Sequence, residues 1–201
     1  MPKKTKSIPV VSLHTGIAVL KISPDNLYSL EETTHAHRHD GHFFILQLNG
    51  KSRHEIDFEN YEITSSTLLY IHPNQIHRGL KNENVTAYFL AINNENLHAE
   101  YLGLLDEITP AIPLVLKAEN LQVITEALSL ALSIFDRKED KLFFPSLKNS
   151  CNTVVALVIS QYLEQSKPLD KLSRFDSITK AFKSTLESNF TMFKRPADYA
   201  N

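Results

Sequence analysis

The sequence predicts an α+β fold in which an antiparallel β-barrel or sandwich is followed by helices. Residues 43–92 contain short apolar runs separated by turn signals, a pattern that is typical of antiparallel strands. Beyond residue 118, apolar residues recur every three to four positions, which is typical of helices. The composition, 42% hydrophobic and 22% charged over 201 residues, is that of an ordinary globular protein.

Four stretches of the first half are predicted as strands, and turn residues separate them. The first ends in Asn-Gly, a strong hairpin signal, the second has a turn at Glu59-Asn60, and the third stops at Pro73. The fourth is rich in β-branched and aromatic residues. The stretches are 43–50, 52–63, 67–73 and 85–92.

Two apolar helices are predicted in the second half, over 119–138 and from about Pro145 onward. Their apolar residues spread almost all round, so each helix must bury more than one face. Packing on the strands covers one face, and a second subunit would cover the other. We therefore expect a homodimer, with an interface on the second helix formed by Val154, Val155, Val158, Ile159 and Tyr162.

Charge and composition exclude several classes of protein. The formal net charge of −2 gives no general field for polyanions, and the single cysteine, Cys151, excludes an internal disulfide and a multi-cysteine metal site. Since no apolar run is long enough for a signal peptide or a membrane helix, we expect a cytoplasmic location and no membrane partner. From Lys171 onward, six basic residues face three acidic ones, which indicates a separate unit.

Histidines are concentrated in one region, with seven of the nine between residues 35 and 77. The stretch HAHRHDGHFF (35–44) places His37 and His39 on one face of a strand, and the same alternation adds Phe43. His77 follows Pro73 and could approach this group from another strand. Such a pattern is compatible with a ligand pocket, a metal site or a polar strand edge without chemistry.

The motifs HRHDGHFFILQLNG and HEIDFENYEITSSTLLYIHPNQIH resemble the cupin half of AraC-family transcription regulators, over about residues 30–90. The tail SRFDSITKAFKSTLESNFTMFKRPADYAN resembles the opening of the DNA-binding domain of that family. The resemblance implies an effector-sensing and dimerisation module that ends just inside its helix-turn-helix domain, so that DNA is bound only by the full-length protein. The implied parts are a cupin-like β-barrel with an N-terminal arm over 1–95, a helical dimerisation segment over 96–167, and the start of the DNA-binding domain over 168–201.

The resemblance also implies a small polar effector inside the barrel. Candidate contacts are His37, His39, Phe43, Gln47, Tyr70 and His77. Metal-binding cupins add a glutamate to their histidines, and Phe43 stands at that position here. We therefore expect no metal, no cofactor and no catalytic residue. The alternative is a small cupin metalloenzyme, an isomerase or dioxygenase, that uses His37, His39 and His77.

Overall fold

The computed structural model describes residues 10–11, 13, 15–25, 35–73, 75–109 and 112–165, together with positions 182, 185 and 189. The chain divides into two compact units, Met1–Glu164 and Gln165–Asn201. The start of the DNA-binding domain expected over 168–201 lies almost entirely outside the described residues, as does most of the expected N-terminal arm. Among the described residues, no helix combines the length and apolar character that crossing a membrane requires.

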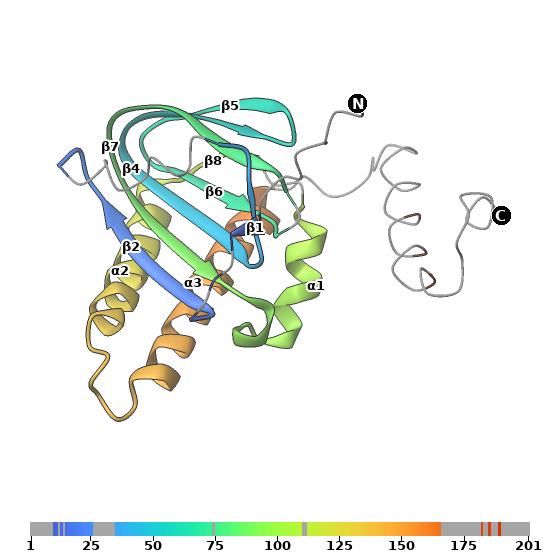
Figure 1. Cartoon of the computed structure of the whole chain (residues 1–201). Coiled ribbons are helices and arrows are strands. Elements are labelled where there is room, and N and C mark those ends of the chain that lie inside the picture. The colour runs from blue at the N-terminus through green and yellow to red at the C-terminus, as the bar shows by residue number, and fades with distance from the viewer. Residues whose placement is uncertain are drawn as a thin grey trace, which may run out of the picture. The chain divides into compact units, whose positions relative to one another are not determined.

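The first unit places its strands before its helices, with one short exception (Figure 1). Its strands are β1 (Val10–Val11), β2 (Ile17–Ile22), β3 (Arg38–His39), β4 (His42–Ile56), β5 (Glu59–Ile63), β6 (Thr67–Ile71), β7 (His77–Ile92) and β8 (Leu114–Val115). Its helices are η2 (Asn94–Asn96), α1 (Ala99–Glu107), α2 (Ala118–Phe135) and α3 (Phe143–Gln165). The predicted α+β class is confirmed.

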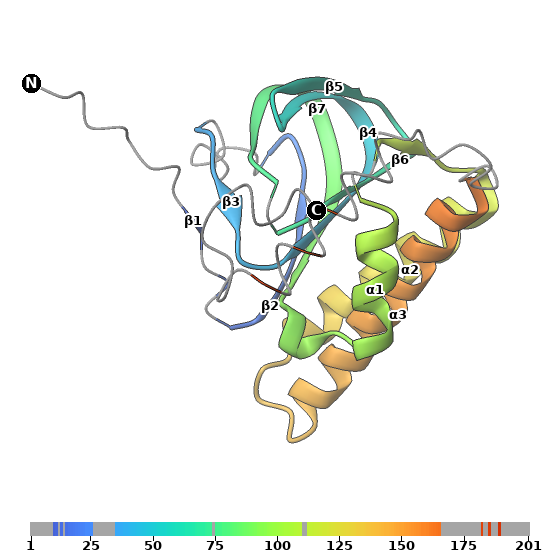
Figure 2. The same ribbon diagram turned by 90° about the vertical axis from the view of Figure 1, so that its right-hand side faces the viewer.

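The strands form one main sheet in the order β2-β7-β4-β6-β8, and β5 pairs with the far half of β4. All its pairings are antiparallel, as predicted. Its hydrogen-bonded order does not close on itself among the described strands, so the predicted barrel is an open, curved sheet. A second, two-stranded sheet joins β1 to β3 in parallel and lies on the opposite side of the main sheet from the helices (Figure 2).

The prediction of a turn at Asn49-Gly50 was wrong, because β4 continues through it. Gly50 has a φ of +83°, and the register of β4 against β7 shifts on either side of Asn49, so these residues form a bulge. A side chain at Gly50 would overlap the carbonyl oxygens of Glu83 and Asn84. The second predicted turn, at Glu59-Asn60, is also displaced. The hairpin between β4 and β5 turns at Asp57-Phe58, where both residues have positive φ.

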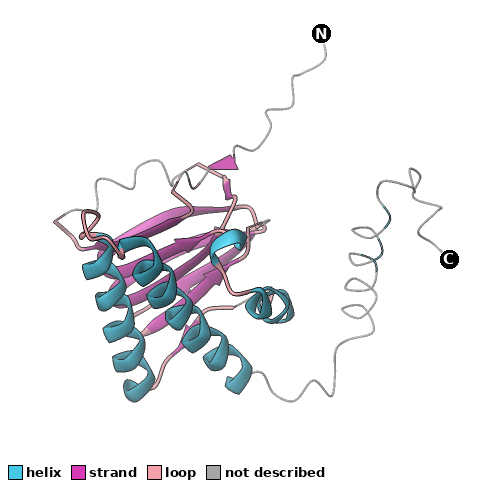
Figure 3. Ribbon diagram, turned by 90° about the horizontal axis from the view of Figure 1, so that it is seen from below, coloured by secondary structure: helices cyan, strands magenta, loops and turns pink. Residues whose placement is uncertain are grey.

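Each face of the main sheet has its own apolar cluster, because side chains alternate along a strand. Phe44, Leu46 and Tyr70 belong to the cluster that includes residues of the helices, and α1, α2 and α3 lie on that side of the sheet (Figure 3). Ile45 and Ile71 belong to the second cluster, on the inner face of the curved sheet. We call this second face the concave face.

The residues predicted to form a dimer interface on α3 lie inside the protomer. None of the side chains of Val154, Val155, Val158, Ile159 and Tyr162 is more than 5% exposed. The second apolar side of α3 is covered from within the same chain, partly by α1, a helix that the pattern did not predict. Asn152 joins them, since its side chain accepts from the amide of His98 (2.8 Å) and donates to the carbonyl of Asn96 (2.8 Å).

Tyr162 also bonds to the edge of β6. Its hydroxyl accepts from the amide of Tyr70 (3.2 Å) and lies within 3.0 Å of the carbonyl oxygen of Ile112. The short β8 pairs only with Thr67 and Leu68 and does not extend to Tyr70. The hydroxyl of Tyr162 therefore accepts from a backbone amide that β8 leaves without a partner. This contact fixes α3 to the sheet.

Candidate functional site

Three imidazoles converge beside the concave face. The ring centroids of His37 and His77 are 4.5 Å apart, and the ring of His39 lies 4.9 Å from the first and 5.0 Å from the second. Each of the three offers a ring nitrogen within 4.8 Å of the others. The ring of Phe43 stacks on His39 at 4.8 Å and contacts Phe89 at 5.6 Å. The structure thus brings together four of the six predicted ligand contacts.

Backbone pairing holds two of these histidines opposite each other. The amide of His37 donates to the carbonyl of His77 (3.0 Å), and the amide of His77 donates back (2.9 Å). The loop before His77 is fixed by Asp57, whose carboxylate accepts from the amide of Ile76 (3.0 Å) and the side chain of Gln75 (2.9 Å). The hairpin turn and the histidine pair are therefore parts of one hydrogen-bonded frame.

The backbone also selects the tautomer of His37 and His77. Nδ1 of His37 lies 2.8 Å from the carbonyl oxygen of His35, and Nδ1 of His77 lies 3.1 Å from that of Gln75. A carbonyl only accepts, so both Nδ1 atoms carry the proton and donate, which leaves a lone pair on each Nε2 when the ring is neutral. Burial, with smaller repulsions from His37, His39 and His54, lowers the pKa of His77 to about 3. His77 is consequently neutral at physiological pH.

Gln47 lies on the predicted face, but its amide is used inside the protein. It donates to the carbonyl oxygens of Gly50 and Ile63 (both 3.0 Å) and accepts from the hydroxyl of Ser52 (2.6 Å). His54 donates from Nε2 to that hydroxyl (3.1 Å), and burial lowers the pKa of His54 to about 4. These three side chains form a continuous polar row on the concave face.

His54 is not among the candidate contacts named from the sequence. Its hydrogen bond to Ser52 places it in the polar row, on the face where Ile56 belongs to the apolar cluster. A usable signal existed in the alternation, which gives His54 the same face as the apolar Ile56. The register pairs Ile56 with His77 directly.

The prediction that Tyr70 lines the same pocket is contradicted. Tyr70 pairs with Phe44, and this pair faces the helices, whereas Phe43 pairs with Ile71 on the concave face. The hydroxyl of Tyr70 lies 2.7 Å from Nδ1 of His42, whose Nε2 is bonded to the side chain of Asn94 (2.9 Å). Burial raises the pKa of Tyr70, and it lowers the pKa of His42 to about 4. Tyr70 is therefore part of a buried contact between the sheet and the helices.

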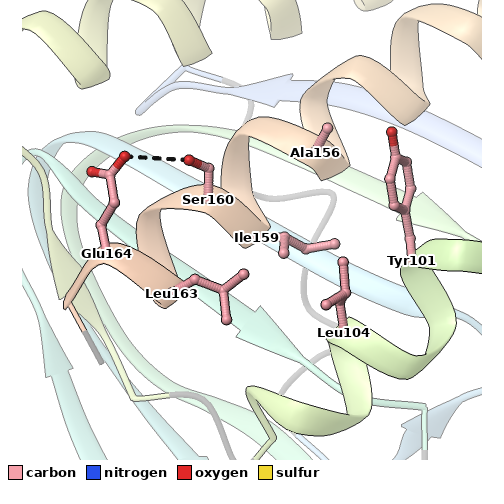
Figure 4. Close-up of a pocket in the computed structure, with 7 residues that line it drawn as sticks. All are labelled: Tyr101, Leu104, Ala156, Ile159, Ser160, Leu163 and Glu164. Carbon is pink, nitrogen blue, oxygen red and sulfur yellow. Dashed lines mark hydrogen bonds between the residues drawn. The ribbon is translucent and has the colours of Figure 1, made fainter. Parts of the chain in front are cut away.

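A separate groove of about 450 Å³ lies between α1 and α3 on the outer side of the helices (Figure 4). Leu104 of α1 and Ile159 and Leu163 of α3 give it an apolar floor. Ser160 donates to Glu164 at its polar end (3.3 Å). On α2, the apolar side chains of Val123 and Leu130 are also exposed. This is a surface suited to protein contact rather than to chemistry.

Chemically, the histidine cluster can donate and accept hydrogen bonds, or it can supply nitrogen ligands to a metal ion. Its surroundings on the concave face combine polar groups with the aromatic rings of Phe43 and Phe89, and this mixture is typical of small-molecule sites.

Comparisons with known proteins found solved structures that are similar to this chain. The crystal structure of the AraC-like transcriptional activator CuxR is 14% identical with a TM-score of 0.46, over 91% of this chain and 61% of CuxR. That of apo ToxT K231A from Vibrio cholerae is 14% identical with a TM-score of 0.41, over 92% of this chain and 69% of ToxT. A cupin protein from Bacteroides fragilis is 15% identical with a TM-score of 0.30, over 41% of this chain and 68% of that protein.

The chain thus spans about three fifths of the length of CuxR. A search of curated proteins found no match. The model of the AraC-like ligand binding domain matches residues 28–148, which contain the histidine cluster and most of the sheet. The chain therefore belongs to the family of AraC-like ligand-binding domains.

Proposed function

We propose that this chain is the effector-sensing and dimerisation module of an AraC-type transcription regulator rather than an enzyme. The observation that carries the proposal is the convergence of His37, His39 and His77 with Phe43 beside the concave face, inside the segment that matches the ligand-binding family. A small polar effector would hydrogen-bond to the imidazoles and pack on the aromatic rings. Its binding would shift the population of two arrangements of the regulator, and DNA would be bound by the full-length protein in the cytoplasm.

Thermal unfolding tests the sensing role directly. The purified chain is melted in the presence of a panel of small carboxylates, sugars and nucleosides, and a bound effector raises the melting temperature by mass action. At effector concentrations near the Kd of the parent chain, His37→Ala should abolish the response, because losing one hydrogen bond to a bound polar group costs about 1–3 kcal/mol, or roughly tenfold or more in affinity. His98→Ala, at an exposed position, is the control. An effector whose response survives in His37→Ala would contradict the assignment of the site.

The homodimer is proposed to form through the outer surface of the helices rather than through the buried side of α3. Support comes from the exposed apolar side chains of α2 and α3, Val123, Leu130 and Leu163, and from the α1–α3 groove, which Leu163 lines. Side chains of this kind on helices suit a two-fold interface, where the same patch serves both subunits. Light scattering at micromolar concentration should show twice the mass of the chain, and a monomer at every concentration would refute the proposal.

A further inference from the structure

The histidine cluster has the features of a metal site beyond its three convergent nitrogens. In both His37 and His77 the Nδ1–H is held by a backbone carbonyl, from His35 and Gln75 respectively. This orients the ring and leaves Nε2 as the atom with a lone pair. Metal-binding histidines are held in the same manner, with the second ring nitrogen donating to a carbonyl or carboxylate.

The distances are compatible with one ion. In a tetrahedral site with metal–nitrogen bonds of about 2.0–2.1 Å, the ligand nitrogens are about 3.3 Å apart. The candidate nitrogens of the three histidines already lie within 4.8 Å of one another. The remaining gap is roughly 1.5 Å at most, and we expect a change in the side-chain rotamer of the partly buried His39 to close it.

We propose that His37, His39 and His77 bind one divalent transition-metal ion of the Zn²⁺, Co²⁺ or Ni²⁺ class, and that this ion holds an anionic ligand. This proposal deepens the proposed sensing function. It rests on that function in one respect, which is that the ion forms part of the effector site. Imidazole nitrogen suits these ions, and three protein ligands leave a coordination position open.

The anionic ligand follows from the charges around the cluster. Among the described residues, the group of candidate ligands consists of His37, His39 and His77 and contains no carboxylate. Phe43 is stacked on His39. Its aromatic ring cannot neutralise the charge of the ion, as a carboxylate at this position would. A divalent ion on three neutral ligands beside an apolar cluster keeps its full charge, which is costly to bury. An anion from solution at the open position, such as a carboxylate, lowers that cost.

Cobalt titration of the untagged chain, stripped with EDTA, tests the metal. Co²⁺ should bind at one equivalent per chain and give the visible absorption of a tetrahedral nitrogen site, and Zn²⁺ should displace it. His39→Gln should weaken Co²⁺ binding at least roughly tenfold. His98→Gln, at an exposed histidine outside the cluster, should leave it unchanged. Circular dichroism and melting in EDTA confirm that both variants fold.

Absence of stoichiometric Co²⁺ binding overturns the metal site, and so does an equal loss of binding in His39→Gln and His98→Gln. If the metal fails while His37→Ala still abolishes an effector response, the sensing function stands without an ion. If Co²⁺ binds as expected but no effector response depends on His37, the sensing function fails and the metal site stands.

The anion is tested on the cobalt-loaded protein with acetate. Acetate should change the visible spectrum in a saturable manner, and an unchanged spectrum overturns the anionic ligand. Phe43→Glu gives a second reading, because its carboxylate would lie beside His39 and occupy the open position. This variant should bind Co²⁺ more tightly and should lose the response to acetate. A folded Phe43→Glu that responds to acetate like the parent chain would contradict the proposed geometry.

Discussion

Replacing Tyr162 by phenylalanine removes one oxygen atom from a buried contact between α3 and the sheet. The hydroxyl accepts from the amide of Tyr70 at 3.2 Å and lies 3.0 Å from the carbonyl oxygen of Ile112. In Tyr162→Phe the amide of the fully buried Tyr70 loses its partner. A buried group left without a partner costs about 1–3 kcal/mol, so we expect the free energy of unfolding to fall by about 2 kcal/mol. For a chain of this length, that is roughly 4–8 °C in melting temperature.

Urea unfolding followed by circular dichroism measures the change, and Tyr61→Phe is the matched control. The hydroxyl of Tyr61 donates to Glu59 at an exposed position (3.1 Å), so its removal should change the free energy of unfolding by less than about 0.5 kcal/mol. The same two variants are then compared by light scattering. If Tyr162→Phe unfolds like Tyr61→Phe but dissociates a dimer, the interior role of Tyr162 is wrong and the interface predicted from its sequence pattern is restored.

Three further predictions concern stability and assembly. Burial and repulsion from His72 lower the pKa of His42 to about 4, although Asn94 and Asp106 act in the opposite direction. Between pH 6.5 and 4, His42 is therefore protonated in the unfolded chain and neutral in the folded chain. Unfolding should therefore cost about 2 kcal/mol less at pH 5 than at pH 7 through this group, and urea midpoints of His42→Gln should show a weaker dependence on pH than those of the parent chain. Gly50→Ala should destabilise the chain by about 2 kcal/mol or more in urea unfolding, because Gly50 has a positive φ and a methyl group there would meet carbonyl oxygens. Gly103→Ala in α1 is the control, because a methyl group there enters open space and should stabilise the chain by about 0.5–1 kcal/mol. Equal effects of the two substitutions would refute the bulge. Leu163→Glu should halve the mass seen by light scattering while circular dichroism shows that the chain is still folded, and an unchanged mass would place the interface elsewhere.

The histidine face was predictable because alternation is a local property, and here it holds across the bend between β3 and β4. His37, His39 and Phe43 needed only their spacing to be placed together. Tyr70 was misplaced because its face depends on the register of β6 against β4, which pairs it with Phe44 rather than Phe43. No pattern within residues 67–73 carries that information.

Two further errors arose because one sequence pattern is compatible with two different structures. An Asn-Gly pair favours a hairpin turn and a bulge alike, since both need a residue with positive φ, so the continuation of β4 could not be inferred from Gly50. The apolar character of α3 was interpreted as a subunit interface because α1 was not predicted. Once α1 covers α3, the same residues become interior. The apolar pattern indicates that a face is covered, and it does not identify the element that covers it.

The paired backbone of His37 and His77 gives the site a built-in reporter. Each amide proton is hydrogen-bonded to the other residue's carbonyl, so its exchange with solvent deuterium requires the two segments to separate. Occupancy that draws the imidazoles together should slow the exchange of both protons at once, whatever the chemical identity of the occupant. Two resonances in a nitrogen–proton NMR spectrum can therefore follow binding at the cluster without a label on the effector.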